Sequence, residues 1–178
     1  MNLNYELTES DYLEYHLYTA SKSKLNKKTR FRTRIIIPII YTLFALYSAI
    51  NDKSYAITIT FVLISIIWYV FYPRYSKWAN KRRFQKHIDE NYKNRINKPI
   101  EISFNEDSVY SKDFSTETKI KGSELNELNE IKNHFFIKLK TGLSLIVPKR
   151  AIINQAEFIK KVTSLGAEHI DELNWEWK

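Results

Sequence analysis

The chain has no cysteine among its 178 residues. This absence excludes a disulfide framework, a thiolate metal site and a cysteine nucleophile, and it is compatible with a reducing compartment. An apolar stretch typical of a secretory signal peptide is also missing from the first 34 residues, which hold strong acids and then strong bases. We therefore expect no signal peptide.

Residues that carry catalytic chemistry are scarce and scattered. The three glycines lie too far apart to form a phosphate-cradling loop: Gly122, Gly142 and Gly166. The histidines share no metal-ligand spacing, and the chain contains no HExxH and no GxSxG motif: His16, His87, His134 and His169. Glutamates at every third position are typical of a solvated acidic edge: Glu124, Glu127 and Glu130. We predict no catalytic residue, no metal ion and no cofactor, and a protein that is not an enzyme.

Two stretches contain no charged residue, Ile35 to Ile50 and Tyr55 to Tyr72. As helices they span about 24 Å and about 27 Å, close to the roughly 30 Å of a bilayer's hydrocarbon core. The four residues between them leave room only for an antiparallel turn. A hairpin buried in a soluble core is the alternative, but such helices normally show a polar stripe that these runs lack. The pattern predicts a transmembrane helical hairpin over residues 35–72.

The net charge of +8 is concentrated beside these runs. Residues 1–21 carry acids and no base, and residues 99–178 carry more acids than bases. One basic block precedes the first run: Lys22, Lys24, Lys27, Lys28, Arg30, Arg32 and Arg34. The other follows the second run: Arg74, Lys77, Lys81, Arg82, Arg83 and Lys86. The positive-inside rule then predicts that the connecting turn faces away from the cytoplasm and that both termini lie in the cytoplasm. A nucleic-acid-binding surface is the alternative that we do not favour.

The segments beside the hairpin have their own patterns. Residues 1–34 begin with alternating apolar residues, which predict a strand that joins a later sheet and makes the hairpin an insertion. A capping box at Thr8 to Asp11 then starts a basic amphipathic helix, in which we expect His16 to be partly buried near Asp11 or Glu14. Residues 73–98 predict a basic juxtamembrane helix. We expect Pro38 in the first turns of its helix and Pro73 to kink or interrupt the second helix.

Residues 99–178 change to period-two alternation, which predicts a cytoplasmic antiparallel meander of five or six strands. We expect strands at 100–104, 108–112, 116–121, 130–132, 135–140 and 143–147. Residues 124–129 are expected to form a loop or one helical turn, and Asn133–His134 and Thr141–Gly142 are expected to be turns. Asn154 should cap a closing helix over Gln155 to Leu165 that ends at Gly166, with the tail packing back on the domain.

The opening NYELTESDYLEYHLY, the basic segment, the two apolar runs and the strand LSLIVPKRAI resemble the YcxB-like protein family. The resemblance covers roughly Leu3 to Ile153, and its most specific piece is Leu145 to Ala151. It implies a bacterial membrane protein whose carboxy-terminal domain is similar to a pleckstrin-homology-like domain, a bent antiparallel sheet closed by one helix. The expected fold class is thus an α+β membrane protein, a two-helix transmembrane hairpin plus a small antiparallel β domain. The family supplies no catalytic residues.

Two clusters of bases are candidate contacts for lipid headgroups or a ligand. Lys81, Arg82 and Arg83 lie on the juxtamembrane helix, where a basic face favours anionic headgroups. Lys149 and Arg150 follow Pro148 at a strand end, where we favour a structural role in closing the sheet over a phosphate contact.

The hypothesis we favour is a non-enzymatic, membrane-anchored binding or regulatory module with a protein or small-ligand partner. One alternative is a ligand-gated, membrane-perturbing effector of bacterial antiphage defence, which rests on architecture alone. Another is an immunity protein against a membrane-acting toxin. The identity of the ligand and any homo-oligomeric state stay open at this point.

Overall fold

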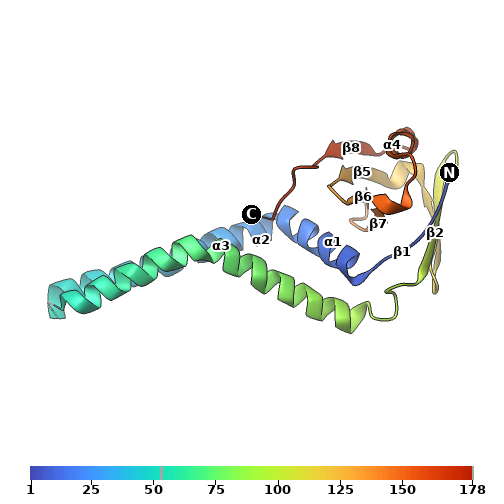
Figure 1. Cartoon of the computed structure of the whole chain (residues 1–178). Helices are drawn as coiled ribbons and strands as arrows, with labels where there is room; N and C mark the ends of the chain where they lie inside the picture. Colours follow the sequence, from blue (N-terminus) through green and yellow to red (C-terminus); the bar gives the residue numbers. More distant parts are fainter. Residues whose placement is uncertain (53, 178) are drawn as a thin grey trace. The chain divides into compact units, whose positions relative to one another are not determined.

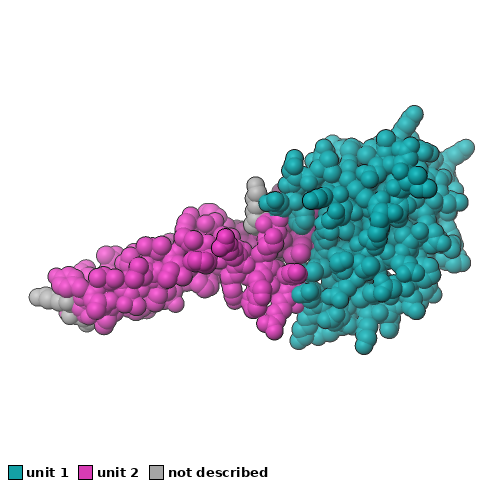
Figure 2. Space-filling view, viewed as in Figure 1, with its two compact units in different colours: residues 1–16, 84–176 teal, residues 17–83, 177–178 magenta. Residues whose placement is uncertain are grey.

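The computed structural model describes residues 1–52 and 54–177, and its elements are drawn in Figure 1. The chain separates into two compact units, shown in Figure 2. Residues 1–16 and 84–176 form the first, which we call the β-domain unit, and residues 17–83 with Trp177 form the second, which we call the hairpin unit. The helices are α1 (Glu9–Lys22), α2 (Lys24–Tyr47), α3 (Tyr55–Asn91) and α4 (Gln155–Ser164), with a π-helical turn η1 (Ser48–Asp52) after α2.

Two four-stranded sheets make up most of the β-domain unit. The first has the order β1 (Asn2–Glu6), β2 (Pro99–Phe104), β3 (Ser108–Lys112) and β4 (Glu117–Lys121). The second has the order β7 (Ser144–Pro148), β6 (His134–Leu139), β5 (Leu125–Glu130) and β8 (Glu168–Asp171). Neighbouring strands are antiparallel except β5 and β8, which are parallel.

Strand β1 pairs with β2, although most of the helical part of the chain separates them in sequence (Figure 1). Leu3 lies opposite Ile102 and Tyr5 opposite Ile100, and both members of β1 are buried. This pairing confirms the prediction that the N-terminal strand joins the later sheet and that the hairpin is an insertion.

The predicted single meander is wrong in one respect, because the sheet breaks between β4 and β5. The predicted loop over residues 124–129 is also wrong, since Leu125 to Glu130 is strand β5. Leu125 and Leu128 are three residues apart, a spacing that places their side chains on opposite faces of a regular strand. A register shift between Leu125 and Glu127 resolves this conflict, and both leucines are fully buried. The strand β8 in the tail has no counterpart among the predicted strands.

Three phenylalanine rings pack against one another in the core of the β-domain unit. Phe158 on α4 packs with ring-centroid distances of 5.5 Å to Phe104 on β2 and 5.0 Å to Phe135 on β6. These contacts join both sheets to the helix. The ends of α4 are as predicted: Asn154 accepts a hydrogen bond from the Glu157 amide, and Gly166 follows the helix at φ 115°.

Helices α2 and α3 run side by side and extend well beyond the apolar runs (Figure 1). Both are long and apolar enough to cross a membrane, and only 11% of each apolar window is buried within the structure. A hairpin in a soluble core would be largely buried, so the low burial disfavours that alternative.

The predicted place of Pro38 in the first turns of its helix is wrong, because α2 begins at Lys24 and Pro38 lies in its interior. Pro73 does not interrupt α3, which continues to Asn91, and Figure 1 shows a bend in α3, as the predicted kink requires. A helical proline leaves the carbonyl four residues earlier without its usual donor. For Pro73 that carbonyl belongs to Tyr69, and it accepts a hydrogen bond from Arg34 Nε on α2 at 3.3 Å. The partner helix thus supplies the missing donor.

The shared phenylalanine core gives the first testable prediction. Phe158→Ala should lower the free energy of unfolding by about 3–5 kcal/mol, because it removes a fully buried ring and leaves a cavity between the sheets. Denaturant unfolding of the detergent-solubilised chain, followed by near-ultraviolet circular dichroism, measures the change. Lys160→Ala, at an exposed position on the same helix, should change it by less than about 0.5 kcal/mol. Similar losses for both variants would contradict the packing described above.

Candidate functional site

The five bases predicted to contact headgroups or a ligand fall into two sets. Lys81, Arg82 and Arg83 are consecutive residues of α3 in the hairpin unit, and the Arg82 guanidinium lies 5.4 Å from the centre of the Trp78 ring. Lys149 and Arg150 belong to the β-domain unit, in a short 3-10 helix, η3 (Lys149–Ala151), directly after β7. The two sets are therefore separate candidate surfaces, and their lipid contacts stay predictions.

Arg150 binds Asp11 on α1 through both terminal nitrogens of its guanidinium. Its Nη1 lies 2.8 Å from Asp11 Oδ1 and its Nη2 lies 2.6 Å from Asp11 Oδ2, while Nη2 also donates to the Glu6 carbonyl. Such a bidentate pair fixes both position and orientation. Lys149 lies 2.5 Å from Glu130 on β5, and both side chains are nearly buried. These contacts are what a structural role for Pro148 to Arg150 requires.

His134 lies beside the same carboxylate, with only 3% of its side chain exposed. Its Nε2 is 2.8 Å from Asp11 Oδ1, and its Nδ1 is 3.1 Å from Glu14 Oε2. The predicted turn at Asn133–His134 is shifted by one residue, because Asn133 belongs to the tight connection between β5 and β6, whereas His134 opens β6. Half of the capping box predicted at Thr8 forms, since the Thr8 amide donates to Asp11 Oδ2. The Thr8 hydroxyl donates to the same oxygen, and the Asp11 amide donates to the Thr8 carbonyl and not to that hydroxyl. One carboxylate therefore joins the start of α1 to β6 and η3.

The surroundings of Asp11 and His134 shift the pKa of both side chains. Burial alone would raise the pKa of Asp11, but hydrogen bonds from Arg150, His134 and Thr8 outweigh it and hold that pKa well below its usual range. Burial alone would lower the pKa of His134, yet its hydrogen bonds with Asp11 and Glu14 raise that pKa above 6.5. His134 thus lies buried between two carboxylates, one of them paired with an arginine, in surroundings that favour its protonated form.

This cluster is suited to holding elements together and not to proton transfer. Each ring nitrogen of His134 faces a carboxylate, and solvent hardly reaches the ring. The carboxylates of Asp11 and Glu14 lie at different ring nitrogens and cannot converge on one ion. Among residues 1–52 and 54–177, no group of three histidine, aspartate or glutamate side chains is placed to hold a metal ion.

A tyrosine-lined cavity of about 310 Å³ in the β-domain unit is the candidate ligand site. Its walls come from β1, α1, the segment after α3, β2, β3 and β7. The aromatic lining consists of Tyr5, Tyr12, Tyr15 and Tyr92. Arg95 and Asp113 add one charge of each sign to the lining. Apolar walls with a few polar groups are typical of small-ligand sites.

Two tyrosines fix the shape of this cavity. The Tyr5 hydroxyl donates to the Ile146 carbonyl at 2.7 Å, which ties the first sheet to the second. Burial raises the pKa of Tyr5 far above its usual value, so the phenol stays neutral and keeps its proton as a donor. Tyr12 is buried too, and its ring centre lies 4.7 Å from that of Tyr92. Tyr5 and Tyr12 are thus held by contacts within the β-domain unit.

Residues 104–162 match the family model of the YcxB-like protein. This match confirms the resemblance over that segment, which includes Leu145 to Ala151, whereas the opening residues and the two apolar runs lie outside it. The YcxB-like segment starts at the end of β2 and ends within α4, so it includes Phe104, Phe135 and Phe158. No curated protein and no solved structure matches the chain.

The YcxB-like segment holds only part of the Asp11 cluster and only part of the tyrosine-lined cavity. It includes His134, Lys149 and Arg150, whereas Asp11 and Glu14 precede it by about a hundred residues. Sequence reasoning missed these pairs because no local pattern links residues that are 123 positions apart. The tyrosine cavity had a weak local signal, since Tyr5, Tyr12 and Tyr15 crowd the opening segment.

The buried histidine predicts a pH dependence of stability. Because the folded pKa of His134 is raised, its contribution is fully present below about pH 6.5, the ordinary value, and is lost as pH rises through the folded pKa. Asp11 has the opposite sign, since its contribution is lost only as pH falls below its ordinary range. His134→Gln should remove most of the stability loss between pH 6 and pH 9, on the order of 1.5–3 kcal/mol for a hydrogen bond to a charged group.

Thermal unfolding in detergent across that pH range measures this effect. The control is His87→Gln, which replaces a histidine exposed on α3 and should keep the wild-type pH profile. An unchanged slope in His134→Gln would show that His134 is not the titrating group.

Proposed function

We propose that this chain is a membrane-anchored, non-enzymatic binding or regulatory module of the bacterial cytoplasmic membrane. The hairpin would be the anchor, and the cytoplasmic β-domain unit would bind the ligand. The observation that carries the proposal is the pairing of β1 with β2 across an inserted hairpin whose apolar surface is exposed.

The pairing supports the proposed topology by a simple geometric argument. Asn2–Glu6 and Pro99–Phe104 are neighbours in one sheet, so the chain must return to the side from which it left. Two membrane crossings satisfy this condition and one does not. The basic residues at the outer ends of both apolar runs favour the cytoplasmic side for the sheet.

The binding role is supported by the cavity of the β-domain unit. Four tyrosines provide aromatic walls, and Arg95 provides an exposed cation. A small molecule or peptide with an apolar or aromatic body and one anionic group fits this chemistry. Two sheets followed by α4 are consistent with the pleckstrin-homology-like part of the proposal, which remains a proposal.

In the alternative hypothesis of a membrane-perturbing effector, the hairpin would damage the membrane and would not serve only as an anchor. Both the effector and the immunity protein would also have an exposed hairpin, so the anchor does not separate them from a binding module. Arrest of growth or leakage of dye on expression would favour the effector, whereas harmless expression would favour the module.

The absence of cysteine makes the topology directly testable with single-cysteine variants. In spheroplasts that express the full chain, a membrane-impermeant maleimide should label Asn51→Cys, at the exposed connection between α2 and α3. The same reagent should label Lys160→Cys, exposed on α4, only after lysis. Labelling in the reverse pattern would overturn the orientation, and recovery of the chain in the soluble fraction would overturn the anchor.

A further inference from the structure

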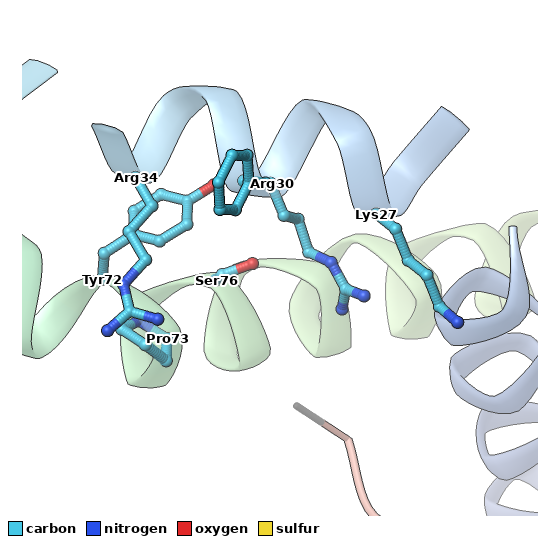
Figure 3. Close-up of a pocket in the computed structure, with 7 residues that line it drawn as sticks. Lys27, Arg30, Arg34, Tyr72, Pro73 and Ser76 are labelled. Carbon is cyan, nitrogen blue, oxygen red and sulfur yellow. The ribbon is translucent and has the colours of Figure 1, made fainter. Parts of the chain in front are cut away.

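A cavity of about 180 Å³ lies between α2 and α3, in the part of the hairpin unit that carries the basic blocks (Figure 3). At about 30 Å³ for each water molecule, it has room for roughly six waters, or for a small charged group. It is lined by Lys27, Arg30, Phe31, Arg34, Tyr72, Pro73 and Ser76. None of these residues is among the bases that the sequence suggested as headgroup contacts.

Helical spacing gathers three of these cations. Lys27, Arg30 and Arg34 are separated by three and four positions on α2, so they share one face of the helix. Figure 3 shows their side chains extending from α2 toward α3. Their charged ends are spread along the cavity, and three positive charges lining one cavity favour an anionic ligand.

Arg34 is held in place by the proline of the facing helix. Its Nε donates to the Tyr69 carbonyl that Pro73 leaves without a helical donor, and its guanidinium lies 4.3 Å from the centre of the Tyr69 ring. Because Nε makes this contact, the two terminal nitrogens of the guanidinium, Nη1 and Nη2, are left to donate to another group. An arginine oriented in this way presents a preorganised pair of donors.

Among the cations of the cavity, Arg30 indicates a bound anion most specifically. Its Nη1 is buried and has no hydrogen-bond partner, while its guanidinium stacks 4.4 Å from the centre of the Trp177 ring. A buried charged donor without an acceptor is costly, so such a group calls for an explanation. An anionic oxygen in the cavity would satisfy it.

Acidic residues are scarce in the sequence around this cluster. From Lys24 to His87 the only acid in the sequence is Asp52, at the far end of the apolar runs. In the part of the chain that the structure describes, no ion pair involves Lys27, Arg30 or Arg34. Ser76 adds a buried hydroxyl, whose oxygen accepts from Asn80 at 3.5 Å and whose own proton is left to donate.

The position of the cavity along the hairpin indicates where the anion comes from. Arg34 directly precedes the first apolar run, and Tyr72 ends the second. In a bilayer these positions lie at the level of the lipid headgroups. The exposed ring of Phe31 beside the cations suits a site that borders on lipid chains.

We propose that this cavity binds the phosphate of an anionic phospholipid headgroup. Arg30 and Arg34 donate to the phosphate oxygens, Lys27 contributes charge, and the Ser76 hydroxyl completes the set. The proposal rests on the membrane anchor, and it adds a defined lipid site where the positive-inside rule alone gives a diffuse basic belt.

The test uses the full chain in an uncharged detergent, titrated with short-chain phosphatidic acid and, separately, with short-chain phosphatidylcholine. Bound lipid is counted by native mass spectrometry. Wild type should bind phosphatidic acid roughly tenfold more tightly than phosphatidylcholine, and Arg30→Gln should lose roughly tenfold in phosphatidic acid affinity, the scale of one charge-assisted hydrogen bond. Arg34→Gln is a second variant that should show the same loss if Arg30→Gln fails to fold.

The matched control is Arg32→Gln, which removes the same charge from the same helix at an exposed position outside the cavity. It should keep wild-type affinity. Equal losses in Arg30→Gln and Arg32→Gln would overturn the site in favour of a nonspecific basic surface, as would unchanged affinity in both cavity variants.

Two further experiments test whether the bound phosphate belongs to a lipid and whether the hairpin anchors the chain in a membrane. Glycerol 3-phosphate should compete poorly, and binding as tight as that of the lipid would overturn the headgroup assignment. Flotation with neutral phosphatidylcholine vesicles tests the anchor alone. A chain that fails to float would contradict the anchor, whereas a chain that floats without lipid preference in micelles would contradict only the site.

Discussion

The antiparallel pairing of β1 with β2 is the constraint on which the rest of the structure depends. These strands flank the whole inserted segment of α1, α2 and α3, so their hydrogen bonds close a long loop within one sheet. The hairpin is therefore an excursion from a folded domain and not a separate N-terminal anchor. Its two apolar runs must leave from and return to the same side of any membrane they enter. The proposed topology follows from this closure together with the flanking charges.

The Asp11 cluster reinforces that closure where the chain leaves β1. Thr8, His134 and Arg150 all hydrogen-bond to Asp11, so the first turn of α1 is fixed to both β6 and η3. Charged groups that are buried without partners destabilise a fold strongly, whereas this set is mutually compensated. The same contacts account for the chemistry of Lys149 and Arg150, whose charges are directed inward to carboxylates. In the hairpin unit, by contrast, Lys27, Arg30 and Arg34 have no carboxylate partner among residues 1–52 and 54–177.

Within the hairpin unit, Pro73 determines how Arg34 is placed at the cavity. Pro73 removes a helical donor, Arg34 replaces it from the facing helix, and the replacement orients a guanidinium toward a cavity that already holds Arg30. Proline thus acts here through the partner helix and not by breaking its own. The cavity of the β-domain unit and the cavity of the hairpin unit differ in chemistry, since tyrosines line one and cations the other.

The sequence by itself determined the features that depend on local patterns. Uncharged runs with flanking bases indicated the hairpin, alternation indicated most strands, and Asn154 with Gly166 bounded α4, because each signal lies within a few residues of its element. Only the tertiary structure decided the break into two sheets, the bulge that buries Leu125 and Leu128, and the parallel addition of β8. It alone brought His134 to Asp11 and Arg34 to Tyr69. These contacts join residues far apart in the chain, and their energy comes from burial and mutual compensation of charge, which no local spacing encodes.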